Sequence, residues 1–443
     1  MSSTAVLVVL AALGVICTLC FFRNKAERLP FPPGPKPLPV IGNLRDLPSK
    51  DEAATYNKWA KEHGDLVYAN VLGRHLLFVN SLQIANDLFE KRSVNYSDRN
   101  ELPMIYDLMG WDWSFGHMPY GERWKKHRKM FERQFRPVVT PTYWPIQRKE
   151  AHGLIRNILD TPGDLIEHLR HNAASVIMNV IYGIEIAPRG DKYIDIAEEA
   201  LDGMAKAAAP GAFLVNIFPL LKYIPAWVPG AGFQKKAAAW KRAVLSMRDL
   251  PFQAVQKTLA NRTASPCFVS HLMSDLDDKG DADDQIETIK GCAGLAYAGL
   301  PHMVTNDDTY NGYFIPAGTT IIGNTWTILH DERNYDHPMR FWPERFLTAN
   351  GTENETILDP ATAAFGYGRR ICPGRFMADA QIWISVACIL TVFDIRPGLD
   401  DKGVPVDIRA EIQSGMICQP FKYSVTPRSE EAKTIIKQTA DLT

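Results

Sequence analysis

The chain has 443 residues, of which 46% are hydrophobic and 22% are charged, and its formal net charge at pH 7 is −1. This length allows one large domain or two smaller ones, and the composition is that of a globular protein rather than a disordered one. A net charge near zero excludes a general nucleic-acid binder, which would be strongly basic.

The N-terminal residues 4–22 form an apolar run without a charge, and Arg23 and Lys25 follow it. At ~1.5 Å per residue the run spans about 28 Å, close to the ~30 Å thickness of a hydrocarbon core. A cleaved signal peptide would instead have a basic leader, a shorter apolar core and a cleavage site of small residues. The sequence therefore predicts a membrane anchor over residues 1–25, with the rest of the chain in the cytosol.

A proline-rich linker over residues 26–45 follows the predicted anchor, because proline fixes φ and stiffens an extended chain. Residues 65–80 (DLVYANVLGRHLLFVN) predict two strands, and Ser81 is placed to cap the helix after them. The pattern is mainly helical from about residue 120 to 299, and strands return at 311–324.

Residues 210–233 (PGAFLVNIFPLLKYIPAWVPGAGF) interrupt the helical region with an apolar segment that prolines break. One interpretation is a buried loop. The other is a lid or access channel that faces a membrane. The sequence leaves both open.

The segment 364–380 (AFGYGRRICPGRFMADA) sets one cysteine among glycines and arginines, directly before an apolar run. The chain has 7 cysteines, an odd and scattered set that fits reduced thiols better than a disulfide framework. Glycines allow sharp turns and a close approach of the backbone to a flat ligand, and a helix over about 374–393 would direct its positive end at the sulfur. A structural cysteine in the core would need neither the glycines nor the arginine. The pattern therefore predicts that Cys372 is a thiolate metal ligand.

The ten-residue pattern F-x-x-G-x-R-x-C-x-G resembles the signature of the cytochrome P450 family of haem-thiolate monooxygenases, and the resemblance extends from about residue 30 to 426. It implies a mainly α fold with a small β region, as one haem domain over residues 46–443 behind an N-terminal transmembrane helix. It also implies that the Cys372 thiolate binds the iron of haem b and favours cleavage of the O–O bond. The other implied cofactor contacts in this loop are Phe365 beside the thiolate, Arg370 on a haem propionate, and Gly368 and Gly374.

Three residues elsewhere extend the resemblance. Trp124 and Arg128 lie four positions apart, hence on one face of a predicted helix, and the family uses such a pair as propionate donors. His302, in LPHMV, stands where the family often places another propionate contact. A single histidine is also commonly a core residue whose hydrogen bonds are satisfied, and that alternative stays open for His302.

The resemblance implies insertion of one oxygen atom of dioxygen into a lipophilic small molecule, with electrons that an NADPH-dependent reductase supplies. The helix around Lys125, Lys126 and Lys129 is strongly basic, which is either an ordinary solvated face or the docking surface for an acidic reductase. The implied location is the endoplasmic reticulum membrane, with one membrane span and the domain in the cytosol. The style of the sequence resembles fungal enzymes of secondary metabolism, and its partners are the membrane, the reductase and the substrate, without nucleic acid.

The family pattern breaks at the junction of Gly299 and Leu300. The family continues A-G into an acid and a threonine that deliver protons to bound dioxygen, whereas here Leu300-Pro301-His302 follows, and proline cannot continue the helix. No acid–threonine pair is therefore available as a catalytic group. An E-x-x-R motif that should precede the next strand is also absent, so roughly 50 to 70 residues are missing at typical element lengths.

The missing segment has two predicted consequences. Arg345, in FWPERF, would lose the buried partners that the family gives it, at about 3 to 5 kcal/mol for an unpaired buried charge. The second consequence concerns function: the chain would be either a haem-binding but non-catalytic splice product of a competent monooxygenase or an erroneous gene model of one. Both remain open as alternatives to an active enzyme.

Overall fold

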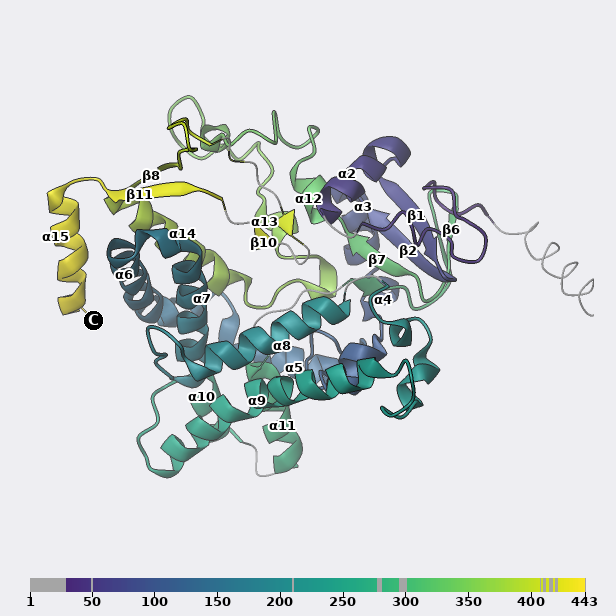
Figure 1. The fold of residues 1–443 in the computed structure, drawn as a ribbon, viewed down its shortest axis with the longest axis horizontal. Coiled ribbons are helices and arrows are strands. Elements are labelled where there is room, and N and C mark those ends of the chain that lie inside the picture. The colour runs from purple at the N-terminus through teal and green to yellow at the C-terminus, as the bar shows by residue number, and fades with distance from the viewer. Residues whose placement is uncertain are drawn as a thin grey trace, which may run out of the picture.

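The structure is a computed structural model that describes residues 29–48, 51–208, 211–276, 281–294, 301–406, 408, 412–413, 417–418 and 421–442. The predicted anchor at 4–22 and the junction at 299–300 lie outside the described residues. Helices dominate the remainder, and the largest sheet lies at the right of the view with a smaller one at the upper left, so the prediction of a mainly α fold with a small β region is confirmed (Figure 1).

The helical part is built from long helices that pack on one another: α5 (Glu122–Phe135), α6 (Trp144–Asp160), α7 (Leu165–Tyr182), α8 (Lys192–Ala208), α9 (Gly232–Ala260), α10 (Phe268–Ser274), α11 (Ala282–Ala293) and α14 (Arg375–Val392). Smaller helices surround the sheets and the C-terminus: α2 (Glu52–His63), α3 (Leu82–Ala85), α4 (Ser93–Tyr96), α12 (Thr325–Leu329), α13 (Ala361–Ala364) and α15 (Glu430–Gln438). Two π-helical turns are also present: Asn86–Lys91 lies between α3 and α4, and Met104–Leu108 precedes α5.

The largest sheet has five strands in the order β1-β2-β7-β4-β3. Its strands are β1 (Leu66–Val71), β2 (Arg74–Val79), β3 (Asp98–Arg99), β4 (His302–Met303) and β7 (Thr320–Gly323). The hairpin predicted over residues 65–80 is present as β1 and β2, which pair antiparallel from Leu66 opposite Val79. Ser81 caps α3, because its hydroxyl accepts a hydrogen bond from the amide of Ile84 at 3.3 Å.

Three two-stranded sheets complete the β structure. The pairs are β5 (Asp308–Tyr310) with β6 (Tyr313–Ile315), β8 (Phe393–Pro397) with β11 (Tyr423–Pro427), and β9 (Ile412–Gln413) with β10 (Ile417–Cys418). Strands β6 and β7 fall in the predicted region 311–324, but they belong to different sheets.

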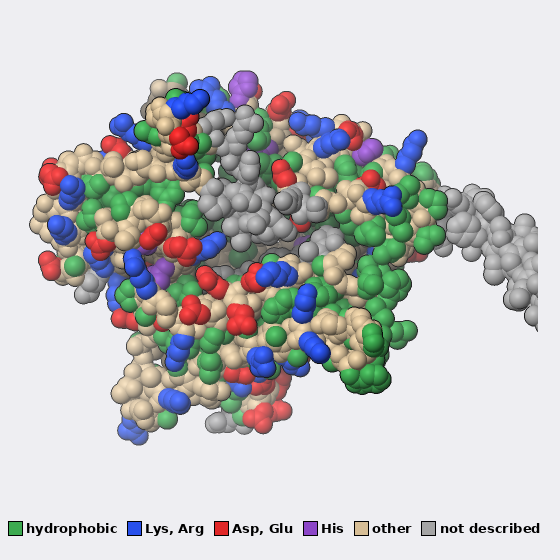
Figure 2. Space-filling model, viewed as in Figure 1, with side chains coloured by type: hydrophobic (Ala, Val, Ile, Leu, Met, Phe, Trp, Pro, Cys, Tyr) green, Lys and Arg blue, Asp and Glu red, His purple; other side chains and the backbone are tan. Residues whose placement is uncertain are grey.

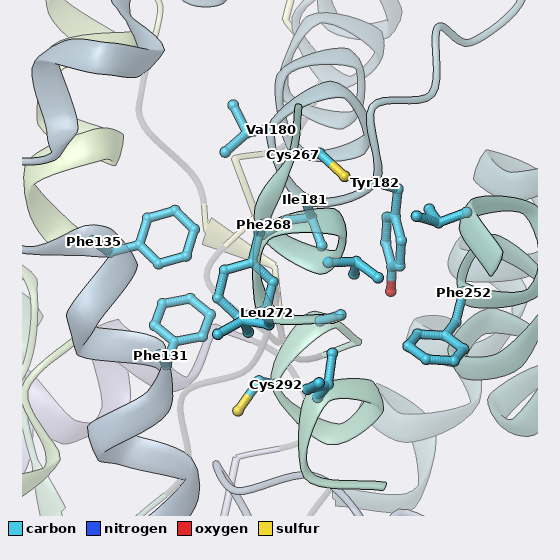
Figure 3. Close-up of a cluster of buried hydrophobic side chains, with 14 of the residues drawn as sticks. Phe131, Phe135, Val180, Ile181, Tyr182, Phe252, Cys267, Phe268, Leu272 and Cys292 are labelled. Carbon is cyan, nitrogen blue, oxygen red and sulfur yellow. The ribbon is translucent and has the colours of Figure 1, made fainter. Parts of the chain in front are cut away.

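The main helical core gathers aromatic side chains from α5, α7, α9 and α10 (Figure 3). Phe131 and Phe135 of α5 stack with ring centroids 4.4 Å apart, and Phe268 of α10 packs against both rings. Such rings each bury a large apolar area, so this cluster holds α5 firmly in the fold. Helix α5 carries Trp124 and Arg128, so the core fixes the position of both.

The segment 210–233 is not a buried loop. The exposed fractions of Leu220 and Trp227 are 80% and 81%, and Figure 2 shows hydrophobic side chains gathered at the lower right, around the chain that leads into α9. Of its described residues, Val215, Asn216 and Ala231 are buried. The exposed side chains count against the buried loop, and the other interpretation, a lid or access channel that faces a membrane, stays a prediction.

Helix α14 matches the helix predicted over 374–393. Among the described residues it is the one helix long and apolar enough to cross a membrane by length and composition alone. One side of α14 packs on α6, and Gln381 donates a hydrogen bond to Asn172 of α7 at 2.9 Å. These contacts place α14 inside the helical part of the fold.

The expectation that Arg345 is left without partners is wrong. Its guanidinium is half-buried and donates to the carbonyl oxygens of Asp336 at 2.6 Å, Arg340 at 2.8 Å, and His337 and Trp342 at 3.1 Å each. Backbone carbonyls therefore offset the partial desolvation of this charge, and the cost for an unpaired buried ion does not apply.

Candidate active site

Cys372 lies in a loop that local backbone contacts define. The loop follows α13, and the amide of Cys372 donates to the carbonyl oxygen of Phe365 at 2.8 Å. The thiol is free and half-buried, and α14 begins at Arg375, three positions later. The cysteine therefore stands at the N-terminal end of a helix, which carries partial positive charge.

The two glycines of the signature occupy their positions for different structural reasons. Gly368 has φ +58°, and a Cβ there would lie 2.0 Å from the carbonyl oxygen of Phe89. Its amide also donates to the carboxylate of Glu90 at 2.6 Å, so Gly368 is required by the chain itself rather than by a ligand. Among the described residues, nothing lies within 4 Å of a Cβ built on Gly374, which leaves open space beside Cys372.

Arg370 is buried and tied to the segment before α5. It donates to the carbonyl oxygens of Ser97 at 2.7 Å, Met118 at 2.7 Å and Phe115 at 3.3 Å, and its guanidinium lies 4.5 Å from the ring centre of Trp124. Burial lowers the pKa of Arg370 to about 10, so it remains a cation at neutral pH. These bonds use three of its five N–H groups.

Trp124 and Arg128 are both buried on α5, as the predicted helical spacing requires. Arg128 donates to the carboxylate of Glu132 and to the carbonyl oxygen of Ile371, at 2.6 Å each. Ile371 immediately precedes Cys372, so Arg128 braces the cysteine loop. Burial lowers the pKa of Arg128, and the attraction of Glu132 and Cys372 opposes that shift.

His302 is buried in β4, and its Nδ1 donates to the carbonyl oxygen of Tyr96 at 2.7 Å. Burial and the nearby guanidiniums of Arg99 and Arg370 lower the pKa of His302 well below its usual range. The ring is therefore neutral, and its Nε2 is an acceptor. Nε2 of His302 could donate a hydrogen bond to a propionate only if it were protonated. That would require the anion to lie close enough to the ring to raise its pKa.

The structure adds Arg99 to this group, a residue that the sequence reasoning missed. Arg99 is buried in β3, which pairs with β4 so that Arg99 lies opposite His302. Its Nε donates to the carbonyl oxygen of Gly116 at 3.2 Å, while its Nη1 has no hydrogen-bond partner among the described residues. A single arginine outside any motif gives no signal in the sequence, because only the strand pairing brings it here.

Several other buried polar atoms nearby also lack hydrogen-bond partners within the part of the chain that the structure describes: the hydroxyl of Ser97, Nε1 of Trp111 and Trp113, and Nε2 of His117. Buried donors are nearly always bonded in folded proteins, so such a concentration points to a bound group. Burial lowers the pKa of Arg99, and the neighbouring Arg370 lowers it further. An anionic group with several acceptors would accept bonds from these donors and offset the repulsion between the two guanidiniums.

These residues fit a haem that bears two carboxylates. We use the name arginine cluster for Arg99, Arg128 and Arg370, which would neutralise the propionates, while Cys372 offers a thiolate and Gly374 leaves room for a flat ring. The predicted residues Trp124, Arg128, His302, Phe365, Gly368, Arg370 and Gly374 all lie in or around this group. Their individual contacts with haem stay predictions.

Comparison with known proteins gives one family. The family model described as Cytochrome P450 matches residues 32–291 and 293–425. Cytochrome P450 monooxygenase 98 of Postia placenta is 35% identical to the chain, over 98% of each protein. Tryptamine 4-monooxygenase of Psilocybe cyanescens is 32% identical, over 96% of this chain and 99% of that protein.

The alignments are longer than the chain itself. The alignment with the Postia placenta protein spans 509 positions, which exceeds the 443 residues of this chain by 66. At least that many positions of the relative therefore have no counterpart here. The alignment with the Psilocybe cyanescens protein spans 501 positions.

Three findings agree with one another: the family match, the two relatives that align over nearly their full lengths, and the cysteine loop beside buried arginines. This chain belongs to the cytochrome P450 family, whose members are haem-thiolate monooxygenases.

Proposed function

We propose that the protein binds haem b through the thiolate of Cys372 and oxidises a lipophilic small molecule. The observation that carries this proposal is the arginine cluster with its unpartnered buried donors next to the Cys372 loop. When bound there, haem iron with a thiolate ligand supplies the activation of dioxygen from which one oxygen atom is inserted into the substrate. The protein's own residues would hold the propionates, exclude water and orient the substrate.

Substitution of Cys372 tests this proposal. Cys372→Ala should abolish the carbon monoxide difference spectrum that is typical of thiolate-bound haem, while Cys388→Ala, a free half-buried cysteine on α14, should leave it intact. Retention of the thiolate spectrum by Cys372→Ala would refute the assignment. The experiment is best done in a chain that also carries the segment missing between Gly299 and Leu300.

A cavity of about 180 Å³ supports a lipophilic substrate. Apolar and aromatic side chains dominate its wall, for example Leu76, Phe78 and Ile105, and the polar side chains there include Asn100 and His117. Such a wall suits a mostly hydrocarbon molecule with one or two polar groups. His117→Phe should weaken the binding of polar substrates several-fold, read from substrate-induced spectral shifts per haem bound.

The basic face of α5 supports docking of a reductase. Lys125 pairs with Glu122 at 2.7 Å and Lys126 pairs with Asp284, whereas Lys129 joins no ion pair among the described residues. Exposed, unpaired cations act on a partner through a salt-screened field. Lys129→Glu should therefore slow reduction of the haem by an NADPH-dependent reductase and reduce its dependence on salt, without changing substrate binding. Unchanged reduction would mean that this face is only solvated.

The exposed apolar side chains support attachment to the endoplasmic reticulum membrane. Phe31 and Val40 are exposed directly after the predicted anchor, and Leu220 and Trp227 project from the segment before α9. Apolar patches of this kind mark interaction surfaces, and lipid is the natural partner behind a membrane anchor. Protease added to intact microsomes should digest the domain, and a protected domain would reverse this topology.

A second candidate function is that of a shortened product without catalytic activity. At least 66 positions of the Postia placenta relative have no counterpart, and the chain lacks an acid–threonine pair after Ala298-Gly299. The test is the genomic sequence across codons 299 and 300, where an unread exon should encode both the acid–threonine pair and E-x-x-R. We use the name longer chain for this protein with that segment inserted between Gly299 and Leu300, or with the matching segment of the Postia placenta relative if the gene holds none.

A further inference from the structure

One arginine lies on an otherwise apolar face of the largest sheet. It is Arg74, the first residue of β2, and it lines the cavity of about 180 Å³ together with Leu76 and Phe78 of the same strand. Side chains two positions apart in a strand point to the same face, so the side chain of Arg74 lies on the cavity side of β2. On the neighbouring strand β7, Thr320 and Ile322 are in register with the last two of these residues and line the same cavity.

The guanidinium of Arg74 has no counter-ion in the part of the chain that the structure describes. Arg74 is half-buried, and burial lowers its pKa without an opposing effect from a described carboxylate. The group stays a cation, because a guanidinium keeps its proton in proteins. The half-buried Arg248, by contrast, pairs with Asp249 at 2.8 Å and with Glu287 at 3.4 Å. Arg74 therefore contributes no ion pair to the described fold and is available to an anion that enters the cavity.

The carboxylates of a haem beside Cys372 are not that anion. In the sheet order β1-β2-β7-β4-β3, three steps between strands separate Arg74 on β2 from Arg99 on β3. At about 4.8 Å a step, the two strands are roughly 14 Å apart across the sheet. A propionate held by Arg99 would leave Arg74 without a partner, so the anion has to belong to another molecule.

The cavity extends from Arg74 to the neighbourhood of the arginine cluster. Its wall includes Asn100, which follows Arg99, and Pro301, which precedes His302. Most of the remaining wall is apolar, with side chains such as Leu76, Phe78, Leu102, Ile105, Ile217 and Ile322. A molecule that fills this space meets hydrocarbon along its length and a cation at one end, which suits an elongated amphiphile.

The charge of the cavity wall has one sign. Arg74 is the one charged side chain among the described residues of the wall, since neither aspartate nor glutamate lines it and burial lowers the pKa of His117 to about 3. Tyr106 also lines the cavity, and burial raises the pKa of its hydroxyl, which keeps that group a neutral hydrogen-bond donor. The wall therefore favours an anionic ligand over a cationic one.

We propose that Arg74 determines specificity by binding a carboxylate of the substrate, so that the substrate is a lipophilic acid. A guanidinium matches a carboxylate through two parallel hydrogen bonds, and one arginine neutralises its single charge. A phosphate monoester would bring up to two charges, of which the described wall neutralises one. This inference rests on the proposed function and deepens it, because it names the substrate class for the same cavity.

Calorimetric titration of the chain as written with decanoate and with 1-decanol tests the proposal. The two probes share a hydrocarbon chain and differ in the head group, and the heat of binding can be read with or without haem. Arg74→Gln should weaken decanoate binding about tenfold or more, because a charge-assisted contact is lost, and should change decanol binding by less than about twofold. Arg74→Lys should lose less affinity than Arg74→Gln, because it keeps the charge but not the planar fork.

The matched control is Arg189→Gln, which removes the same charge at an exposed position outside the cavity wall and should leave the binding of both probes unchanged. Arg74→Gln should also leave the thermal midpoint within about 3 °C of the parent chain, because the guanidinium has no ion pair to lose. If that variant does not fold, Arg74→Met repeats the titration with most of the side-chain stem retained.

Several outcomes would overturn the proposal. Absent decanoate binding, or decanoate binding that Arg74→Gln leaves unchanged, would make Arg74 a solvated cation. Equal weakening of decanoate and decanol would mean that Arg74 only shapes the wall. The proposed function fails separately: decanoate binding that depends on Arg74 in a chain without a thiolate haem spectrum would support this inference and count against the haem assignment.

Discussion

The cysteine loop and the apolar side of α14 that carries Trp383 and Leu390 are neighbours in sequence, yet they differ in how completely they are built. In the loop, Cys372, Arg370 and Gly368 all have backbone or side-chain partners. On α14, Trp383 and Leu390 are more than half exposed. The described chain therefore holds the loop through contacts with residues 89–118 and α5, and leaves one side of the next helix uncovered.

The largest expected contrast is between two adjacent residues on opposite sides of α14. Ile389 is 7% exposed and Leu390 is 51% exposed. In the chain as written, Ile389→Ala should cost about 2 to 5 kcal/mol of unfolding free energy, because it leaves a cavity, and Leu390→Ala should cost less than about 0.5 kcal/mol. Urea unfolding measures both.

A smaller contrast concerns the two glycines of the loop. Gly368→Ala should destabilise the chain by about 2 kcal/mol, because φ is +58° and the new methyl group meets the carbonyl oxygen of Phe89. Gly374→Ala should change stability by less than about 1 kcal/mol, because nothing described lies within 4 Å of its Cβ, and should instead lower haem content. Similar stability losses for the two variants would remove the distinction between a structural and a ligand-facing glycine.

The sequence predicted those features whose causes are local. The β1–β2 hairpin, the Ser81 cap and the start of α14 depend on alternation, capping and glycine placement within a few residues. Arg99 could not be found, because its role depends on the pairing of β3 with β4 across two hundred residues of chain. The carbonyl partners of Arg345 also escaped prediction, because backbone oxygens in an irregular loop carry no sequence signal.

The smallest expected effect is a pH dependence of stability. Burial and the nearby Arg99 lower the pKa of His117 to about 3 from its ordinary 6.5. The unfolded chain therefore takes up a proton below pH 6.5 that the folded chain refuses, so stability is lost as the pH falls toward 3. For this group alone the loss from pH 7 to pH 5.5 is about 1 kcal/mol.

Substitution isolates this contribution. His117→Gln should flatten the pH dependence of the unfolding free energy by that amount, and His271→Gln, at an exposed position of α10, should leave it unchanged. An unaltered slope in His117→Gln would mean that folding does not lower the pKa of His117.

The most direct test of the account is the carbon monoxide difference spectrum of the two chains, expressed side by side. The longer chain should give a stable spectrum of thiolate-bound haem and NADPH-dependent oxidation, because it regains the acid–threonine pair and the length of its relatives. The chain as written should give neither, since proton delivery alone contributes about 10² to 10⁴ in rate and the exposed apolar side of α14 promotes aggregation. Comparable spectra and turnover from both chains would contradict the claim that the missing segment completes this fold.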